Sequence, residues 1–112
     1  MSLKGMPMPA DLSDLGRFTD VSLLILLSLA GEPRHGYAMI EDIARFSGTV
    51  FEPGTLYGAL MRLERKGWIT AMPAEDRRRP YRLTGAGSVA LRQQIATLNQ
   101  IVTVGRQRLA LA

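Results

Sequence analysis

The sequence contains no cysteine, and this absence excludes a disulfide scaffold, a thiolate metal site and a cysteine nucleophile. Aromatic residues make up only 6% of the chain, so the core is expected to be mostly aliphatic. The one histidine, His35, stands beside a predicted helix start, where a hydrogen-bonding or surface role is more common than metal ligation. No nucleophile–base pair, phosphate-binding glycine loop or cluster of metal ligands is evident, so we expect neither catalysis nor a cofactor or metal.

Long hydrophobic runs are missing as well. The longest, residues 21–30, is too short to cross a bilayer, and no cationic start followed by a cleavage site suggests export. We therefore expect a cytoplasmic protein without a membrane partner, a location that also suits a chain without cysteine.

Acidic residues are absent from the last third of the chain. Residues 1–76 hold seven Lys/Arg and ten Asp/Glu, a balance of −3, whereas residues 77–112 hold seven arginines and no acid, a balance of +7. The two balances add up to the net charge of +4. This asymmetry favours a polyanionic partner.

A short basic helix is predicted to begin at Pro53, since proline suits the first helical position. Leu56, Leu60 and Leu63 recur at the spacing of one buried stripe, and Gly67 follows two cations as a helix stop. The opposite face has small residues near its start and arginine further along, which suits the DNA major groove. The alternative is the solvated face of an ordinary amphipathic helix. The expected DNA-binding residues on and beside this face are Gly54, Thr55, Tyr57, Gly58, Met61, Arg62 and Arg65.

Two runs of strand-forming residues, 68–72 and 81–84, follow this helix and predict a β-hairpin. The segment between them holds two prolines and a charge run, so we predict a loop without strand pairing. Three adjacent arginines in the loop suit a phosphate backbone or a minor groove, unless the loop is merely solvated. The expected DNA-binding residues of this wing are Arg77, Arg78, Arg79 and Tyr81.

The first predicted helix spans residues 21–30, with Thr19 or Asp20 as its N-cap. It is apolar nearly all round, so it should be buried on more than one side, against the chain itself and against another surface such as a partner subunit. Before it, residues 1–18 are expected to form a flexible arm with one helical turn near residues 11–17.

A second helix is predicted over residues 37–46, and together with the basic helix it would form a helix-turn-helix. Its inward residues are expected to be Ile43 with Met39 or Ile40. Its outward residues are expected to be Glu41, Asp42 and Arg45. Gly36, just before this helix, is expected to allow close packing.

The last predicted helix, residues 86–109, carries apolar residues at alternating steps of four and three, the heptad seam of a coiled coil. A dimer seam is therefore expected, the alternative being a helix that packs only on its own subunit. The expected dimerisation residues are Leu23, Leu27, Leu91, Ile95, Leu98, Val102 and Leu109. Any small hydrophobic effector is expected at the dimer interface, in an apolar cleft lined by Leu23, Leu27, Ile95 and Leu98.

Three motifs in order, HGY, PGTLYGALMRLERKGWI and RRRPYRLTGAG, resemble the PadR-type bacterial transcriptional regulators, most of all their short subfamily with a single C-terminal helix. The resemblance covers residues 21–91. It implies a winged-helix dimer, usually a repressor that a small molecule releases from its operator. It also implies DNA contacts at Thr55, at Tyr57 and at the arginines of the wing.

The sequence thus predicts a mostly α fold with a small β-wing, that is, a winged helix-turn-helix at residues 19–84 and a C-terminal dimerisation helix at residues 85–112. The predicted function is a homodimeric, ligand-responsive repressor that binds double-stranded DNA at an inverted-repeat operator. One alternative is a winged helix used for protein–protein contact that has lost DNA binding. Another is a ligand sensor whose main output is not release of DNA.

Overall fold

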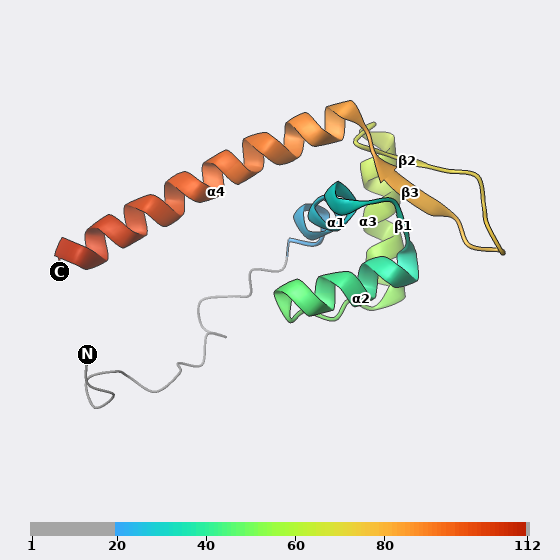
Figure 1. Cartoon of the computed structure of the whole chain (residues 1–112), viewed down its shortest axis with the longest axis horizontal. Helices are drawn as coiled ribbons and strands as arrows, with labels where there is room; N and C mark the ends of the chain where they lie inside the picture. The colour runs from blue at the N-terminus through green and yellow to red at the C-terminus, as the bar shows by residue number, and fades with distance from the viewer. Residues whose placement is uncertain (1–19, 112) are drawn as a thin grey trace.

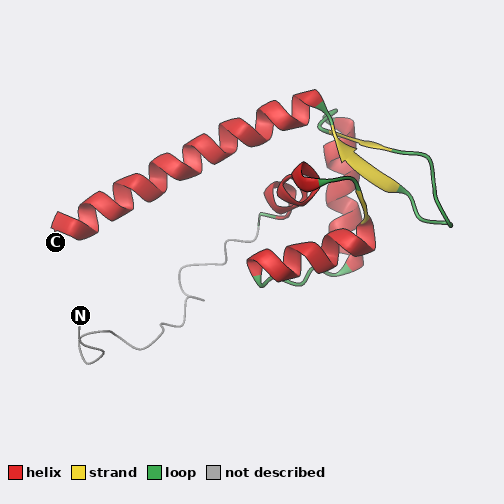
Figure 2. Ribbon diagram, viewed as in Figure 1, coloured by secondary structure: helices red, strands yellow, loops and turns green. Residues whose placement is uncertain are grey.

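The computed structural model of the chain describes residues 20–111. The expected arm at residues 1–18, its helical turn and Thr19 as a cap lie outside the described residues. Helices dominate, with three short strands beside them (Figures 1 and 2). In chain order the elements are α1 (Val21–Gly31), β1 (Arg34–His35), α2 (Gly36–Ser47), α3 (Pro53–Arg65), β2 (Ile69–Ala71), β3 (Pro80–Leu83) and α4 (Gly85–Leu111).

Helix α1 lies at the centre of the fold, where it packs against α2, α3, α4 and β3 (Figure 1). Asp20 caps its N-terminus, since the carboxylate accepts a hydrogen bond from the N–H of Leu23 at 3.1 Å. The helix contributes five of the thirteen buried apolar residues of the core. The prediction that α1 is buried on more than one side is confirmed, and elements of its own chain provide that cover.

Helix α2 begins at Gly36, one residue earlier than expected, because His35 serves as its N-cap. Met39 and Ile43 are fully buried, while Ile40 is only half-buried. The helix ends at Gly48, whose φ of 74° is left-handed and therefore suits glycine. Residues 48–52 then lead into α3, which packs on α2.

Asp42 of α2 does not simply face outward, as the sequence pattern suggested. Its carboxylate accepts a 2.8 Å hydrogen bond from the hydroxyl of Ser28, a buried residue of α1. Arg34 and Arg45 lie 3.6 Å and 3.3 Å from the same carboxylate. A buried hydroxyl requires a partner, and Asp42 supplies it, so this residue joins α2 to α1.

Helix α3 starts at Pro53, as predicted, and buries Leu56, Leu60 and Leu63. Ala59 is buried with them. Past its end, Gly67 has a φ of 75°, the left-handed conformation that the sequence indicated. The local chemistry of proline, leucine spacing and glycine therefore sets the bounds of this helix.

The wing belongs to a sheet of three antiparallel strands in the order β1-β3-β2, one more strand than predicted. In β2 and β3, Ile69 pairs with Leu83 and Ala71 with Tyr81. On the other edge of β3, Arg34 pairs with Tyr81. The segment before α2 is thus tied to the wing.

The loop at the tip of the wing is more ordered than predicted. Glu75 and Arg78 form a β-bridge, with hydrogen bonds of 2.7 Å and 2.8 Å between their backbones. Asp76 and Arg77 between them have φ values of 49° and 67°. A two-residue turn with both residues left-handed matches the twist of a hairpin, so strand pairing resumes at the tip.

Helix α4 has 27 residues and leaves the wing at a tight junction. The hydroxyl of Thr84 accepts from the N–H of Gly87 at 3.0 Å and donates to the carbonyl of Gly67 at 2.6 Å. Leu91 is buried in the core and Leu98 is half-buried, whereas residues 99–111 are exposed. The outer part of α4 therefore extends beyond the other helices and strands (Figure 1).

Candidate nucleic-acid interface

One face of α3 is open to solvent, because the leucine stripe occupies the other. Tyr57 and Met61 are 47% and 57% exposed, so two large side chains of this face are open to solvent. Gly58 is half-buried. The remaining residues predicted for this face are all exposed, and they are Gly54, Thr55, Arg62 and Arg65.

The wing arginines and α3 meet at a shared hollow. A cavity of about 250 Å³ is lined by residues of the wing, of α3 and of the start of α2. These residues are His35, Tyr37, Tyr57, Arg77, Arg78 and Arg79. The structure thus brings Tyr57 and the three arginines together, as a common contact surface requires.

His35 and Tyr37 were not among the site residues predicted from the sequence. Tyr37 is 65% exposed at the first turn of α2. The sequence did place Tyr37 next to Gly36 at a predicted helix start. Only the pairing of β1 with β3, however, shows that this helix start adjoins the wing.

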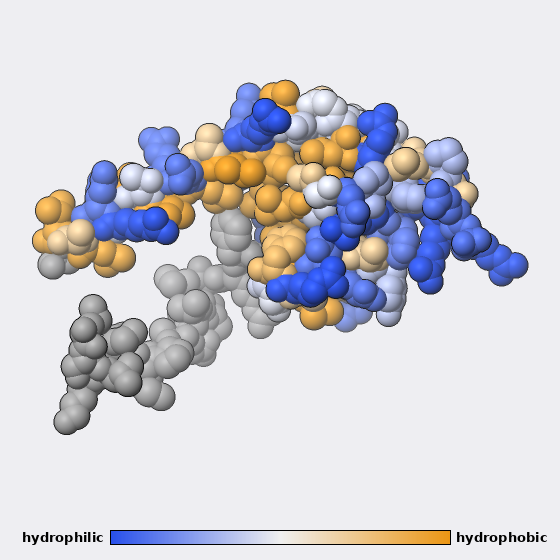
Figure 3. All heavy atoms as spheres, in the orientation of Figure 1, coloured by the Kyte–Doolittle hydropathy of each residue, from blue (hydrophilic) through white to orange (hydrophobic). Residues whose placement is uncertain are grey.

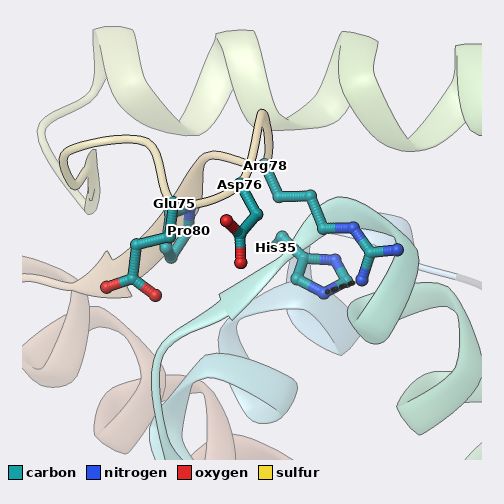
Figure 4. Close-up of a pocket in the computed structure, with 5 residues that line it drawn as sticks. All are labelled: His35, Glu75, Asp76, Arg78 and Pro80. Atoms are coloured by element: carbon teal, nitrogen blue, oxygen red, sulfur yellow. Dashed lines mark hydrogen bonds between the residues drawn. The ribbon is translucent and has the colours of Figure 1, made fainter.

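Figure 4 shows the wing tip against the start of α2. There a guanidinium nitrogen of Arg78 lies 3.4 Å from Nε2 of His35. The neighbouring cavity, about 460 Å³, is lined by His35, Glu75, Asp76, Arg78 and Pro80. The other ring nitrogen of His35, Nδ1, accepts from the N–H of Ala38 at 3.2 Å.

The charges of the wing are not neutralised internally. Within residues 20–111, the ion pairs involve Arg34 and Arg45 with Glu32 and Asp42, and no carboxylate lies within ion-pairing distance of the wing arginines. All three wing arginines are exposed. Their positive charge is therefore available to an external anion.

Tyr81 lies at the base of the wing, half-buried and packed against the core. Burial raises the pKa of its phenol above the usual 10.0, and the charges of Glu64 and Tyr57 raise it further, while Arg79 lowers it. The phenol is therefore protonated at neutral pH and can donate a hydrogen bond.

The residues predicted for dimerisation fall into three groups. Leu23 and Leu91 are 4% and 5% exposed within the single chain, so they belong to its core. Leu27 and Leu98 are half-buried beside that core. The outer seam of α4 is open: Ile95, Val102 and Leu109 are 45%, 47% and 78% exposed. Figure 3 shows apolar residues along α4, with the hydrophilic wing at the opposite end.

The leucines predicted to line an effector cleft open onto different cavities. Leu23 lines one of about 300 Å³ between α1, the end of α3 and α4, together with Lys66 and Trp68. Lys66 Nζ stands 4.7 Å from the centre of the Trp68 ring. Leu27 lines another cavity of about 270 Å³ that also includes Phe46 of α2.

Residues 20–111 contain neither a candidate membrane span nor a candidate metal site. No helix in this part of the chain has the length and apolar character needed to cross a membrane. No group of three or more His, Asp or Glu residues within it is arranged to hold a metal ion.

A helix-turn-helix with an open helix face and a basic wing defines the class of winged-helix DNA-binding regulators. The particular family follows from comparison with known proteins. The pattern of the transcriptional regulator PadR-like family matches residues 25–93, so the chain belongs to that family. The resemblance inferred from its motifs is thereby confirmed.

Solved structures of the family share this fold. A PadR family regulator from Clostridium difficile R20291 superposes with a TM-score of 0.72 at 26% identity, over 80% of this chain and 97% of that one. A PadR family regulator from Eggerthella lenta is 30% identical, with a TM-score of 0.67, over 85% of this chain and 86% of that one. The predicted fold, mostly α with a small β-wing, is confirmed.

A sequence relative is longer. The 37.1 kDa protein in transposon TN4556 of Streptomyces fradiae is 39% identical over 85 residues, which are 76% of this chain. The chain spans about a quarter of the length of that curated relative, since the match covers 25% of it.

Proposed function

We propose that this chain binds double-stranded DNA as a homodimer and regulates transcription from an inverted-repeat operator. One observation carries the proposal: Tyr57, on the flank of the open face of α3, lines the same hollow as the three wing arginines, which have no ion-pair partner among the described residues. Because the two lie side by side, α3 can enter the major groove while the wing contacts the backbone of the same duplex.

Within this interface, α3 would read the operator. Its first turn carries Gly54 and Thr55 and its second carries Gly58, and the small size of these residues allows close approach to base edges. Tyr57 and Met61 would contact the groove, and Arg62 and Arg65 would reach bases or phosphates. The wing residues Arg77, Arg78 and Arg79 would act on phosphate or in a narrow minor groove, with Tyr81 supporting them from the base of the hairpin.

Dimerisation would use the open seam of α4. Residues Ile95, Val102 and Leu109 would meet their copies in a partner, with Leu27 and Leu98 at the margin and Leu23 and Leu91 supporting the seam from the core. Two recognition helices related by a two-fold axis require half-sites about one DNA turn, or a multiple of it, apart.

A small hydrophobic effector would act at the same interface, near Leu23, Leu27, Ile95 and Leu98, and release a repressor from its operator. The helix α4 contains no aromatic residue, so α4 would contribute only aliphatic contacts to such a ligand. A titration with a candidate ligand, followed by NMR, tests this site. Shifts confined to the wing would contradict it.

The decisive experiment is duplex binding at a series of salt concentrations. Phosphate contacts release counterions, so affinity should fall steeply with salt, and Arg78→Ala should lower the slope by about 1. If the chain is instead a protein-interaction module, no salt-dependent binding to duplex will be found. A search for an inverted repeat upstream of the coding region, followed by footprinting, then locates the operator.

Sequence reading by α3 has its own test. Arg62→Ala should weaken operator binding by roughly 1–3 kcal/mol if the guanidinium reads a base. Wing variants should weaken binding to operator and to unrelated duplex alike. Unchanged operator binding by a folded Arg62→Ala protein would place the reading surface elsewhere.

A further inference from the structure

His35 is held in one tautomer by the helix it caps. Its Nδ1 accepts the N–H of Ala38 at 3.2 Å, in the first turn of α2. A nitrogen that accepts a hydrogen bond carries no hydrogen, so the hydrogen of the neutral ring must lie on Nε2. The outer nitrogen of His35 is therefore a hydrogen-bond donor.

Arg78 approaches that same nitrogen. Its Nη1 lies 3.4 Å from Nε2 of His35 (Figure 4), and a guanidinium has donors but no acceptor. Both groups are thus donors, and they converge on one point without an acceptor between them. The bridge between Glu75 and Arg78 fixes the backbone at this position, so the convergence is a feature of the wing turn.

We propose that His35 and Arg78 together bind one phosphate of the DNA backbone, with His35 as a neutral donor and Arg78 as a charged one. A phosphate oxygen accepts more than one hydrogen bond and so satisfies both groups. The site rests on the proposed function, and it adds a contact from the start of α2 to those of α3 and the wing.

The surroundings favour a backbone phosphate over a carboxylate of the chain itself. Glu75 and Asp76 line the adjacent cavity, but neither lies within ion-pairing distance of Arg78 in the described residues. On the other side, Arg77 and Arg79 line the hollow that His35 and Arg78 share. The three arginines of the wing tip outnumber its two acids, so the net field at the His35–Arg78 pair favours an anion, beside the proposed groove-binding helix.

The test begins with two variants of His35. Asparagine is a favoured N-cap, so His35→Asn keeps the cap of α2 while its short side chain cannot reach the site beside Arg78. His35→Ala removes both the cap and the donor. We expect both variants to bind a short duplex of arbitrary sequence about ten-fold more weakly than wild type, because each loses one hydrogen bond to a charged group. Only His35→Ala should melt at a lower temperature.

The salt dependence of duplex binding distinguishes the neutral donor His35 from the charged donor Arg78. Because neutral His35 displaces no counterion, His35→Asn should leave the salt slope unchanged, whereas Arg78→Ala should reduce it by about 1. If both residues bind one phosphate, the His35→Asn effect should nearly vanish in an Arg78→Ala background. The matched control is the Arg62→Ala background on α3, in which His35→Asn should still weaken duplex binding about ten-fold. Additive losses with Arg78→Ala, or wild-type affinity of His35→Asn, would overturn the proposal.

The source of the phosphate is tested by ¹⁵N NMR of the His35 ring. Duplex should shift the Nε2 signal, and inorganic phosphate at the same total phosphate concentration should not. An equal response to inorganic phosphate would identify a free-anion site and overturn the assignment to the DNA backbone. Failure of the wild type to bind duplex contradicts the proposed function itself, whereas normal binding with a silent His35 contradicts only this site.

Discussion

The hydroxyl of Tyr57 lies directly over Gly36: a Cβ on residue 36 would come within 2.5 Å of the Tyr57 oxygen and 2.7 Å of the ring carbon that bears it. Gly36 begins α2 and Tyr57 stands on the flank of α3. Because Gly36 has no side chain, the ring of Tyr57 can lie against the start of α2. The expectation that Gly36 allows close packing is confirmed, and its partner is a proposed DNA-contacting residue.

Gly36→Ala should displace the Tyr57 ring and weaken duplex binding without unfolding the protein. The clash involves the far end of a side chain that can rotate away, so little stability should be lost. We expect a loss of affinity of about 1 kcal/mol, the scale of one hydrogen bond, and similar in size to the loss in Tyr57→Ala. Fluorescence anisotropy measures it. A double variant that binds more weakly than Tyr57→Ala would show that Gly36 acts by another route.

Asp76→Asn should strengthen DNA binding. Asp76 is an acid at the tip of a basic wing, and its φ of 49° suits asparagine, so the turn should persist while one charge that repels phosphate is removed. Exposed charge pairs are worth about 0.2–1 kcal/mol, and the gain should shrink at high salt. Glu41→Gln, the same change of charge at an exposed acid of α2 that takes part in none of the ion pairs among the described residues, is the control. Equal gains in both variants would indicate a net-charge effect only.

The sequence indicated much of this architecture through residues whose local chemistry decides the backbone. Pro53 and Gly67 bound α3, and the leucine stripe orients it, so its open face was predictable. Strand β1 was not, because it has only two residues and pairs with β3, far along the chain. The turn at Asp76 and Arg77 lacks glycine, the usual signal for two left-handed residues. The donor pair of His35 and Arg78 was not predictable either, because only the pairing of β1 with β3 brings these two residues together.

Gly87→Ala should destabilise the junction between the wing and α4. A Cβ at Gly87 would overlap the carbonyl oxygen of Trp68 and lie 2.8 Å from its carbonyl carbon, and backbone cannot rotate aside. Overpacking of this kind costs about 1–3 kcal/mol. Urea unfolding at one protein concentration measures the loss.

Gly105→Ala is the matched control for that prediction. The same substitution in the same helix meets nothing within 4 Å in its own subunit. Because residue 105 lies on the proposed seam, both variants are compared at a protein concentration low enough to keep the chain monomeric, where Gly105→Ala should stabilise the protein by up to about 1 kcal/mol, the difference in helix propensity. If both substitutions shift the unfolding midpoint in the same direction, the close approach at Trp68 does not limit stability.

Val102→Asp should separate the proposed dimer while leaving the winged helix folded. Val102 lies on the open seam of α4, 47% exposed and outside the core, so its own subunit does not depend on it. In a dimer, two copies of the new carboxylate would face one apolar contact, and burying an unpaired charge costs several kcal/mol. A seam of under three heptads cannot offset that loss. Sedimentation should show a monomer, and circular dichroism an intact fold.

Gln100→Asp introduces the same charge two residues away, on the face of α4 opposite the seam, and should leave the dimer intact. The Val102→Asp monomer keeps one recognition helix and one wing, so it should retain only weak, salt-sensitive binding that does not distinguish operator from other duplex. The Gln100→Asp dimer should still make that distinction. If Val102→Asp stays dimeric and binds operator normally, the seam of α4 is not the interface, and the partner must contact the chain through another surface.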